Sequence, residues 1–500
     1  MLDEYRQRFR AFHTHWQREQ YLHLTGRKSQ SETSYLFREN SDLFSSTKLA
    51  ELRTRYDETA EYRSTERAAL QRLMAFARAG LLALQTLELT EEIADYETQA
   101  TFTWEEQPLT INQAQFLLGQ EAAPGRRREL QARQADLVQQ IQDLRAERLA
   151  KLQQGTQTLG YDNYMLLQQL SQQCEFEKLT EATSQLLTKT ESEFASQLRP
   201  LLARSANVSL DEALPADLSY AQRLPRFEPY FVRERWREIY SDLFAGLGFK
   251  VGQQSQVEID DLSRAGKQQH SFCAPLQVPE EIKLIINPGV AVSGGPQFYQ
   301  HLLQTAGQTQ LYAWTSRESL YEFRVPGDPA LTLAWGALFS YLLQDAAFLV
   351  GTFAFPESSE FRHALAVFKL LQVRRTAALL RYETELYAGK LGTQAGSRFA
   401  ELLTDATRLH YSEAEHLRAV ETAFQSAACL RAWAFEAQFH EHLKTHYGTR
   451  WWTSRQAGDL LIDLWNTGHR YSVEELAAQV GLGALDFEWL ANELLEALKS

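Results

Sequence analysis

Histidine pairs are the first residues whose spacing suggests chemistry in this sequence. His442 and His446 are four residues apart, so on a helix their imidazoles share one face and can bind one transition-metal ion. Leu443 and Lys444 follow His442, so the glutamate base of a hydrolytic zinc site is missing at the matching position. Together with His440, this cluster predicts a solvated polar helix face, with adventitious nickel or zinc binding as the alternative.

Cysteine is the second reactive residue type. Cys174, Cys273 and Cys429 are an odd number without metal-ligand spacing, which argues against both a disulfide framework and a thiolate zinc site. A nucleophilic Cys429 would need an adjacent histidine or a helix amino terminus, and the sequence identifies neither. We therefore expect reduced, buried thiols and a cytoplasmic protein.

The segment Gln300–Leu349 is the most informative stretch. It contains the sequence QTAGQ, which runs from Gln304 through Thr305 to Gln308, and later the run Pro-Ala-Leu-Thr directly before Leu333. This segment resembles the active-site region of the thimet oligopeptidase and oligoendopeptidase F family of zinc peptidases. In that family one helix carries His-Glu-x-x-His, and a later helix supplies a glutamate as the third zinc ligand. The resemblance places these four functional positions at Gln304, Thr305, Gln308 and Leu333.

The side chains at these positions lack the chemistry that the resemblance implies. Gln304 and Gln308 offer neutral amides, which are poor zinc ligands, and Leu333 donates nothing. Thr305 has no group that titrates near neutral pH, so it cannot act as the general base. We predict no catalytic residue and no zinc cofactor. We interpret the segment as a buried, amide-bridged helix in which Gly307 marks a tight helix crossing.

An active enzyme is the alternative. His301 lies near the same helix face and could form a displaced metal site with Glu318 or Glu322. The chain would then be a metallo-oligopeptidase with displaced ligands. Because zinc needs several converging donors, we favour a histidine that is satisfied by hydrogen bonds.

Peptide capture is a separate expectation. Asp260, Arg264 and Lys267 resemble the family's Asp-x-x-x-Arg-x-Gly-Lys segment, which leads into the edge strand that pairs with substrate, here residues 271–278. An exposed edge strand binds an extended peptide through backbone hydrogen bonds without catalysis. We predict Arg264, Lys267, Phe272 and Tyr312 as peptide contacts.

The predicted function is therefore a catalytically inactive relative of zinc oligopeptidases that binds peptides or a protein partner. A structural subunit that pairs with an active paralogue is a further alternative. The formal net charge of −13 opposes binding to nucleic acid or to an anionic membrane. Residues 1–17 contain no apolar signal segment, and the most apolar run, residues 346–355, is too short to span a bilayer.

Helices must position most of these residues. The first 200 residues are rich in Gln, Glu, Arg and Leu with helical spacing, and we expect one continuous helix over most of residues 128–154. Alternating residues 100–111 predict a short hairpin. Glycines and β-favouring runs predict a small antiparallel or mixed sheet near residues 249–290, and helices follow from Gln297.

Recurrent prolines between Pro200 and Pro229 indicate a boundary between two lobes. The predicted fold is mainly α, a two-lobed helical oligopeptidase-like, zincin-like fold around a deep groove. It has an N-terminal helical lobe at residues 1–205 and a degenerate metallopeptidase-like lobe at residues 206–500, with the small sheet in the second lobe. Hydrophobic residues make up 44% of the chain, enough for a large core without disulfide or metal support.

Overall fold

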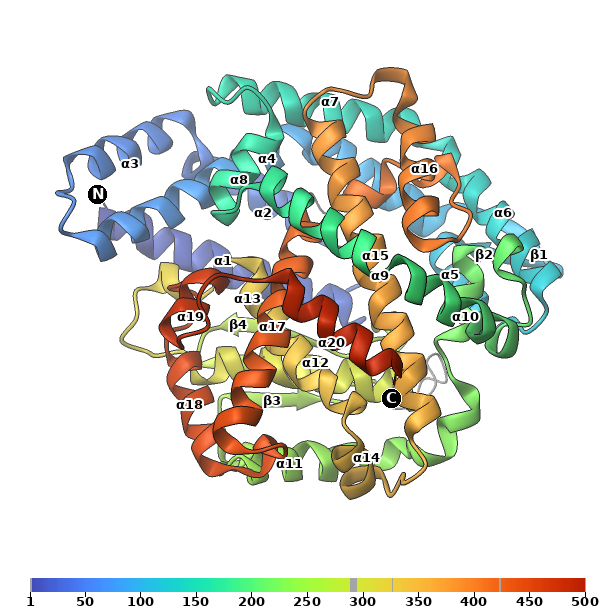
Figure 1. Ribbon diagram of the computed structural model, residues 1–500. Coiled ribbons are helices and arrows are strands. Elements are labelled where there is room, and N and C mark those ends of the chain that lie inside the picture. The colour runs from blue at the N-terminus through green and yellow to red at the C-terminus, as the bar shows by residue number, and fades with distance from the viewer. Residues whose placement is uncertain (1, 288–294, 326, 422–423, 500) are drawn as a thin grey trace.

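Helices make up most of the chain (Figure 1), as the sequence predicts. The structure, a computed structural model, describes residues 2–287, 295–325, 327–421 and 424–499. The α-helices are α1 (Leu2–Leu24), α2 (Thr33–Glu39), α3 (Ser46–Glu58), α4 (Ser64–Gln99), α5 (Ile111–Leu118), α6 (Pro124–Gln140), α7 (Gln142–Thr158), α8 (Tyr164–Gln172), α9 (Phe176–Ser205), α10 (Pro215–Ala221), α11 (Trp236–Gly246), α12 (Gly295–Trp314), α13 (Pro329–Ser340), α14 (Ala346–Phe353), α15 (Ser359–Tyr387), α16 (Ala395–Thr407), α17 (Gln425–Tyr447), α18 (Arg455–Asn466), α19 (Val473–Gln479) and α20 (Phe487–Lys499).

Two small sheets complete the fold. The strands are β1 (Thr101–Trp104), β2 (Gln107–Thr110), β3 (Val257–Asp260), β4 (Phe272–Gln277) and β5 (Glu281–Ile285). Strands β1 and β2 form the predicted hairpin between α4 and α5. The other sheet lies in the predicted region and is mixed, in the order β3-β5-β4, with β5 parallel to β3 and antiparallel to β4. Strand β4 is thus an edge strand. Pro275 is tolerated in it because proline has no backbone N–H group, and the unpaired edge of the strand needs no hydrogen-bond donor.

The main hydrophobic core lies among the helices of the second half. Trp335, Trp451 and Trp465 are fully buried in it, because large aromatic side chains bury the most apolar area. Trp335 of α13 packs edge to face against Trp465 of α18, with ring centroids 5.9 Å apart. A separate aromatic core, which includes Phe9 and Phe12 of α1, holds α1 against α4. The elements that carry the candidate site are therefore tightly packed.

The predicted continuous helix over residues 128–154 is wrong. Helices α6 and α7 are separated at Ile141, a buried residue with φ −113° and ψ 19°. The break frees the carbonyl of Val138, which accepts a hydrogen bond from Nη1 of Arg145 at 3.2 Å. Arg145 is buried and bridges two glutamates from other elements. Its ion pairs therefore favour a bend that the helical periodicity does not reveal.

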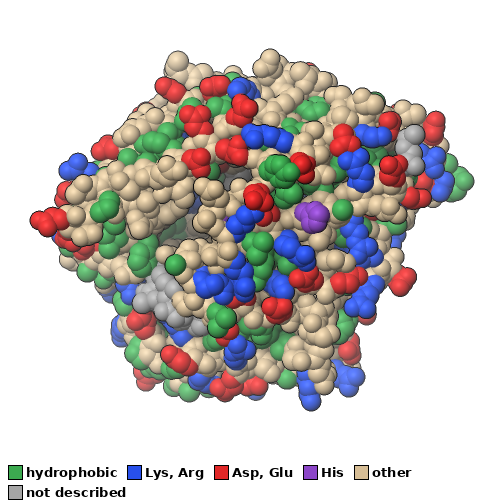
Figure 2. Space-filling view, turned by 180° about the vertical axis from the view of Figure 1, so that it is seen from behind, with side chains coloured by type: hydrophobic (Ala, Val, Ile, Leu, Met, Phe, Trp, Pro, Cys, Tyr) green, Lys and Arg blue, Asp and Glu red, His purple; other side chains and the backbone are tan. Residues whose placement is uncertain are grey.

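The boundary between the two predicted lobes stays a prediction. Helix α9, which precedes it, packs against α15 and α20, which follow it, and α1 contacts β4. Figure 2 shows the rear face of the molecule, where acidic and basic side chains are mixed and the surface is hollowed near its centre. Among the described residues, no single helix is long and apolar enough to cross a membrane, and the apolar pair Pro329–Gln344 and Ala346–Phe353 is bent by 78°.

Candidate functional site

Helices α12 and α13 cross at very short range. A Cβ atom at Gly307 of α12 would lie 2.2 Å from the carbonyl oxygen of Trp335. A Cβ atom at Gly336 of α13 would lie 2.8 Å from Cγ of Gln304. Because larger residues would clash with this backbone, glycine is what permits the close approach. The prediction that Gly307 marks a tight helix crossing is confirmed.

The crossing contains the positions that the sequence singled out. Gln304 and Gln308 are four residues apart on one face of α12, and both face Gly336, where a Cβ atom would lie 3.1 Å from Nε2 of Gln308. Leu333 lies one turn before Gly336 on α13 and is partly buried against the core. Thr305 follows Gln304 and is 3% exposed. The two glutamines and Leu333 thus lie around one helix contact.

A buried ion pair fixes the start of α13. Asp328, which is 2% exposed, accepts hydrogen bonds from the backbone N–H groups of Ala330 and Val473, each at 3.0 Å. The guanidinium of Arg431 from α17 donates to both carboxylate oxygens of Asp328, at 2.9 and 2.7 Å. The bidentate contact with Arg431 and the bond from Val473 connect the start of α13 to α17 and α19.

Edge strand β4 runs beside α12. The Phe272 side chain packs against the hydrophobic cluster that contains Tyr21 of α1, whereas the thiol of Cys273 lies near Thr309 of α12. Burial raises the pKa of Cys273 to about 12, so this thiol stays protonated. Strand β4 pairs with β5 on one side only, among the strands that the described residues form. Helix α12, which carries the two glutamines, therefore also contacts this edge strand.

Comparisons with known proteins identify the architecture. No protein-family model and no curated protein matches the chain. A solved structure of PZ peptidase A with an inhibitor is 13% identical, with a TM-score of 0.63 over 90% of this chain and 83% of that one. A structure provisionally named oligoendopeptidase F is 12% identical, with a TM-score of 0.65 over 96% of this chain and 87% of that one. This chain has the oligoendopeptidase fold.

The zinc ion that the family resemblance implies does not fit the side chains at the α12–α13 crossing. A zinc site with an open water position takes about three imidazole, thiolate or carboxylate donors from the protein. Gln304, Gln308 and Leu333 supply two neutral amides and a hydrocarbon. Throughout the described part of the chain, no group of three His, Cys, Asp or Glu side chains is placed to hold a metal ion.

The amides of Gln304 and Gln308 are not bridged, contrary to the sequence-based interpretation. Both side chains are half-buried, and neither forms a hydrogen bond with any other described residue. Cγ of Gln304 and Nε2 of Gln308 lie beside Gly336, and because no polar atom of either amide is both fully buried and unpaired, both amides are accessible to water or to a ligand. The site therefore presents hydrogen-bonding groups in place of metal ligands.

The displaced metal site proposed for His301 does not form with the expected carboxylates. Glu322 is buried and pairs with Arg6 at 2.7 Å, and Glu318 is exposed. The ring of His301 instead contacts His270, with centroids 4.3 Å apart. Burial, and secondarily the charge of His270, lower the pKa of His301 to about 4, so its imidazole is neutral at physiological pH. Its Nδ1 atom is buried without a partner, contrary to the expected hydrogen-bonded histidine.

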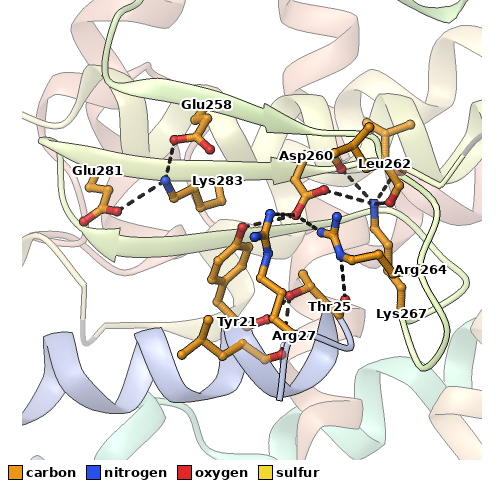
Figure 3. Close-up of polar contacts among 12 residues, drawn as sticks. Tyr21, Thr25, Arg27, Glu258, Asp260, Leu262, Arg264, Lys267, Glu281 and Lys283 are labelled. Atoms are coloured by element: carbon orange, nitrogen blue, oxygen red, sulfur yellow. Dashed lines mark hydrogen bonds and ion pairs between the residues drawn. The ribbon is translucent and has the colours of Figure 1, made fainter. Parts of the chain in front are cut away.

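Lys267 and Arg264 belong to an internal network around Asp260 (Figure 3). The ammonium of Lys267 is fully buried and donates to the carbonyl oxygens of Asp260, Leu262 and Ile286 at 2.9, 2.9 and 2.8 Å. These bonds use its three protons, so none remains for a bound peptide.

Arg264 donates to the carbonyl oxygen of Thr25 at 3.1 Å and also contacts the carboxylate of Asp260. Burial of Asp260 opposes its ionisation, but the hydrogen bond from Arg27 and the charge of Lys267 lower its pKa to about 2. The network therefore fixes the segment that precedes β4 against α1, and both predicted peptide contacts have structural roles.

Tyr312 extends the glutamine face of α12, because it lies four residues beyond Gln308. Its hydroxyl is 3.5 Å from the hydroxyl of Thr332 on α13, and its ring lies 5.7 Å from the ring of His469. Burial raises the pKa of Tyr312 to about 12 and lowers that of His469 to about 4, so both groups are neutral near pH 7. Sequence analysis missed His469, since no spacing connects it with α12.

The remaining candidates lie elsewhere. His442 and His446 stack with ring centroids 4.1 Å apart on α17, and Nδ1 of His446 donates to the carbonyl oxygen of His442 at 2.8 Å. The predicted polar face holds for these two, whereas His440 is buried against Tyr341. Burial raises the pKa of Cys429 to about 11, so this thiol is not activated near neutral pH.

Proposed function

We propose that this protein is a non-catalytic peptide-binding protein built on the oligoendopeptidase fold. The observation that supports this most directly is the pair of accessible amides of Gln304 and Gln308, which have no partner among the described residues. Each amide both donates and accepts, as a peptide backbone does. They occupy the positions where the family resemblance places metal ligands. The ligand class that suits them is an extended peptide segment, free or within a protein partner.

Strand β4 supplies the second contact in this proposal. A peptide that pairs with a free strand edge gains backbone hydrogen bonds that do not depend on its sequence, and side-chain pockets add selectivity. Helix α12 contacts β4 and carries the two glutamines and Tyr312. Phe272 stands at the start of the strand. We assign these residues to the peptide site and leave out Lys267, whose donors are satisfied internally.

Hydrolysis is absent from the proposal for chemical reasons. Peptide cleavage by a zinc enzyme needs a metal-bound water and a base that removes its proton. Thr305 supplies no base, and Leu333 cannot complete a ligand set. His301, with its pKa lowered to about 4, is a weak base at neutral pH. Bound peptides should therefore be released intact. We place the protein in the cytoplasm, because all three of its cysteines are free.

Fluorescence anisotropy with a labelled library of short peptides tests this proposal. We expect the wild type to bind a subset of peptides and the Gln304→Ala/Gln308→Ala variant to lose at least tenfold in affinity, since two hydrogen bonds contribute about 2 kcal/mol. Gln139→Ala is the matched control, because Gln139 is an exposed glutamine on α6. Its affinity should equal that of the wild type.

Mass spectrometry of the same library tests the absence of cleavage. We expect every peptide to be recovered intact after incubation with zinc-supplemented protein. Cleavage that a chelator abolishes would show an active metallo-oligopeptidase. If no peptide binds and the protein instead co-elutes with an active peptidase during size-exclusion chromatography, the structural-subunit alternative holds and the peptide proposal fails.

A further inference from the structure

A cavity of about 210 Å³ lies between α4, α7 and α8, and its lining includes no residue of α12 or α13. Tyr387 of α15, with Leu417, Val420 and Glu421, closes one side of it. At about 30 Å³ per water molecule it has room for roughly seven waters, so it suits a compact ligand. The cavity is thus separate from the proposed peptide site.

Two arginines that line this cavity have no carboxylate partner among the described residues. Arg78 is 8% exposed, its Nη1 donates to the hydroxyl of Tyr161 at 2.7 Å, and its Nε is buried without a hydrogen-bond partner. Arg148 is half-buried and forms no ion pair with any described residue. A buried guanidinium nitrogen without a partner costs free energy, so Arg78 favours an anion in the cavity, and the half-buried Arg148 adds a second positive charge to the cavity lining.

The acidic residue of the cavity does not neutralise them. Glu421 lines the cavity but pairs with Arg145 at 2.8 Å. Arg145 also binds Glu97 at 2.7 Å, so its charge is satisfied by these two carboxylates. The pairing leaves the positive charges of Arg78 and Arg148 uncompensated within a chain whose net charge is −13. A positive cavity in an acidic protein attracts anions selectively.

The tyrosines of the cavity add a neutral donor. The hydroxyl of Tyr164 accepts a hydrogen bond from Nε2 of Gln168 at 2.6 Å, and no described residue accepts its own proton. Burial raises the pKa of Tyr164 to about 12, so the phenol keeps that proton. Tyr387, by contrast, donates to the carbonyl oxygen of Val420 at 3.1 Å. Tyr164 is therefore available to donate to a ligand.

We infer that this cavity binds a small organic anion, a carboxylic acid with a compact apolar body. Arg78 and Arg148 would hold the carboxylate, which matches the planar donor geometry of guanidinium groups. Leu82, Leu149 and Leu167 line the rest of the cavity and would contact the apolar body. A fully hydrated inorganic anion would leave these leucine walls without contacts.

Isothermal titration calorimetry with benzoate, benzamide and inorganic phosphate tests this inference on the full chain. Benzoate should bind at least tenfold more tightly than benzamide, which has the same body without the charge, and more tightly than phosphate, which lacks the body. Arg148→Met should weaken benzoate binding at least tenfold, and Arg148→Lys should retain part of the affinity. Arg133→Met is the matched control, because Arg133 is exposed on α6. Its affinity should be unchanged.

Three results would overturn the inference: no heat from benzoate with the wild type, equal binding of benzoate and benzamide, or preferential binding of phosphate. Undiminished benzoate binding by Arg148→Met would place the anion elsewhere. Because Arg78 is buried, Arg78→Met is used only if circular dichroism shows the wild-type helix content. Arg148 is half-buried, so its substitution provides the test even if the Arg78 variant does not fold.

Discussion

Gly336 and Gln304 are in contact across the α12–α13 crossing: a Cβ atom at Gly336 would lie 2.8 Å from Cγ of Gln304 and 3.1 Å from its carbonyl oxygen. Since backbone is part of this contact, the helices are as close as their main chains allow. The amides of α12 and the side chain of Leu333 are therefore held at fixed relative positions. Gly336 itself adds no side chain beside Gln304 and Gln308, so a larger residue at this position would displace them.

Gly307→Ala should destabilise the protein. Its Cβ would meet the carbonyl oxygen of Trp335 at 2.2 Å, so the helices must move apart, and overpacking of this kind costs about 2 kcal/mol. Gly351→Ala is the control, because Gly351 is exposed in α14 with nothing within 4 Å of its Cβ position. It should gain about 1 kcal/mol from helix propensity. Urea unfolding of both variants measures these differences, and equal effects would contradict the tight crossing.

Restoring the four donor positions should create a zinc site. The variant Gln304→His, Thr305→Glu, Gln308→His and Leu333→Glu is expected to bind one zinc ion per chain, since two imidazoles and a carboxylate would meet at the crossing. Elemental analysis after dialysis measures the zinc. The same variant with Leu333 retained should bind more weakly, because it lacks the third ligand. A folded fourfold variant without bound zinc would show that Leu333 does not face the two glutamines.

Local periodicity accounts for what the sequence predicted well. Gln304 and Gln308 share a face because four residues span slightly more than one helical turn, and the alternation before α5 correctly indicated the β1–β2 hairpin. The tight crossing at Gly307 was predictable for a similar reason, since a glycine inside a helix is costly unless packing requires it.

Contacts between distant segments account for what the sequence did not reveal. Lys267 resembles a ligand-binding residue in its motif, but the carbonyl of Ile286, which it binds at 2.8 Å, is 19 residues away. His270 and His301 meet only because the segment before β4 folds over α12. The accessible amides likewise depend on Gly336, whose distance from α12 no sequence pattern gives.

Arg431→Met should strongly destabilise the fold. The substitution leaves the carboxylate of Asp328 buried without its cation at the start of α13, and breaking a buried pair from one side costs about 3–5 kcal/mol. Arg226→Met is the control, because Arg226 pairs with Glu360 at an exposed site, where such pairs contribute about 0–1 kcal/mol. Chemical unfolding at one pH compares the two. A loss below 1 kcal/mol in Arg431→Met would contradict a structural role for this pair.

Glu383 should make the stability of the protein depend on pH. It is 1% exposed in α15 and accepts hydrogen bonds from the N–H of Phe424 at 2.9 Å and from the hydroxyl of Ser426, at the start of α17. Burial raises its pKa from the ordinary 4.5 to about 7, although the two hydrogen bonds oppose this. Between these pH values the folded protein holds a proton that the unfolded chain has released.

The free energy of unfolding should therefore fall as pH rises from 4.5 to 7 and stay level above pH 7, a change on the order of 3 kcal/mol from this group alone. Glu383→Gln keeps an acceptor for both bonds but cannot titrate, so its stability relative to the wild type should rise over the same interval. Urea unfolding at pH 5 and pH 7.5 measures this. The control Glu92→Gln, at an exposed position of α4, should follow the wild type at both pH values. If the free energies of unfolding of Glu383→Gln and the wild type instead differ by the same amount at both pH values, Glu383 is ionised in the folded protein and its carboxylate caps α17 as an anion.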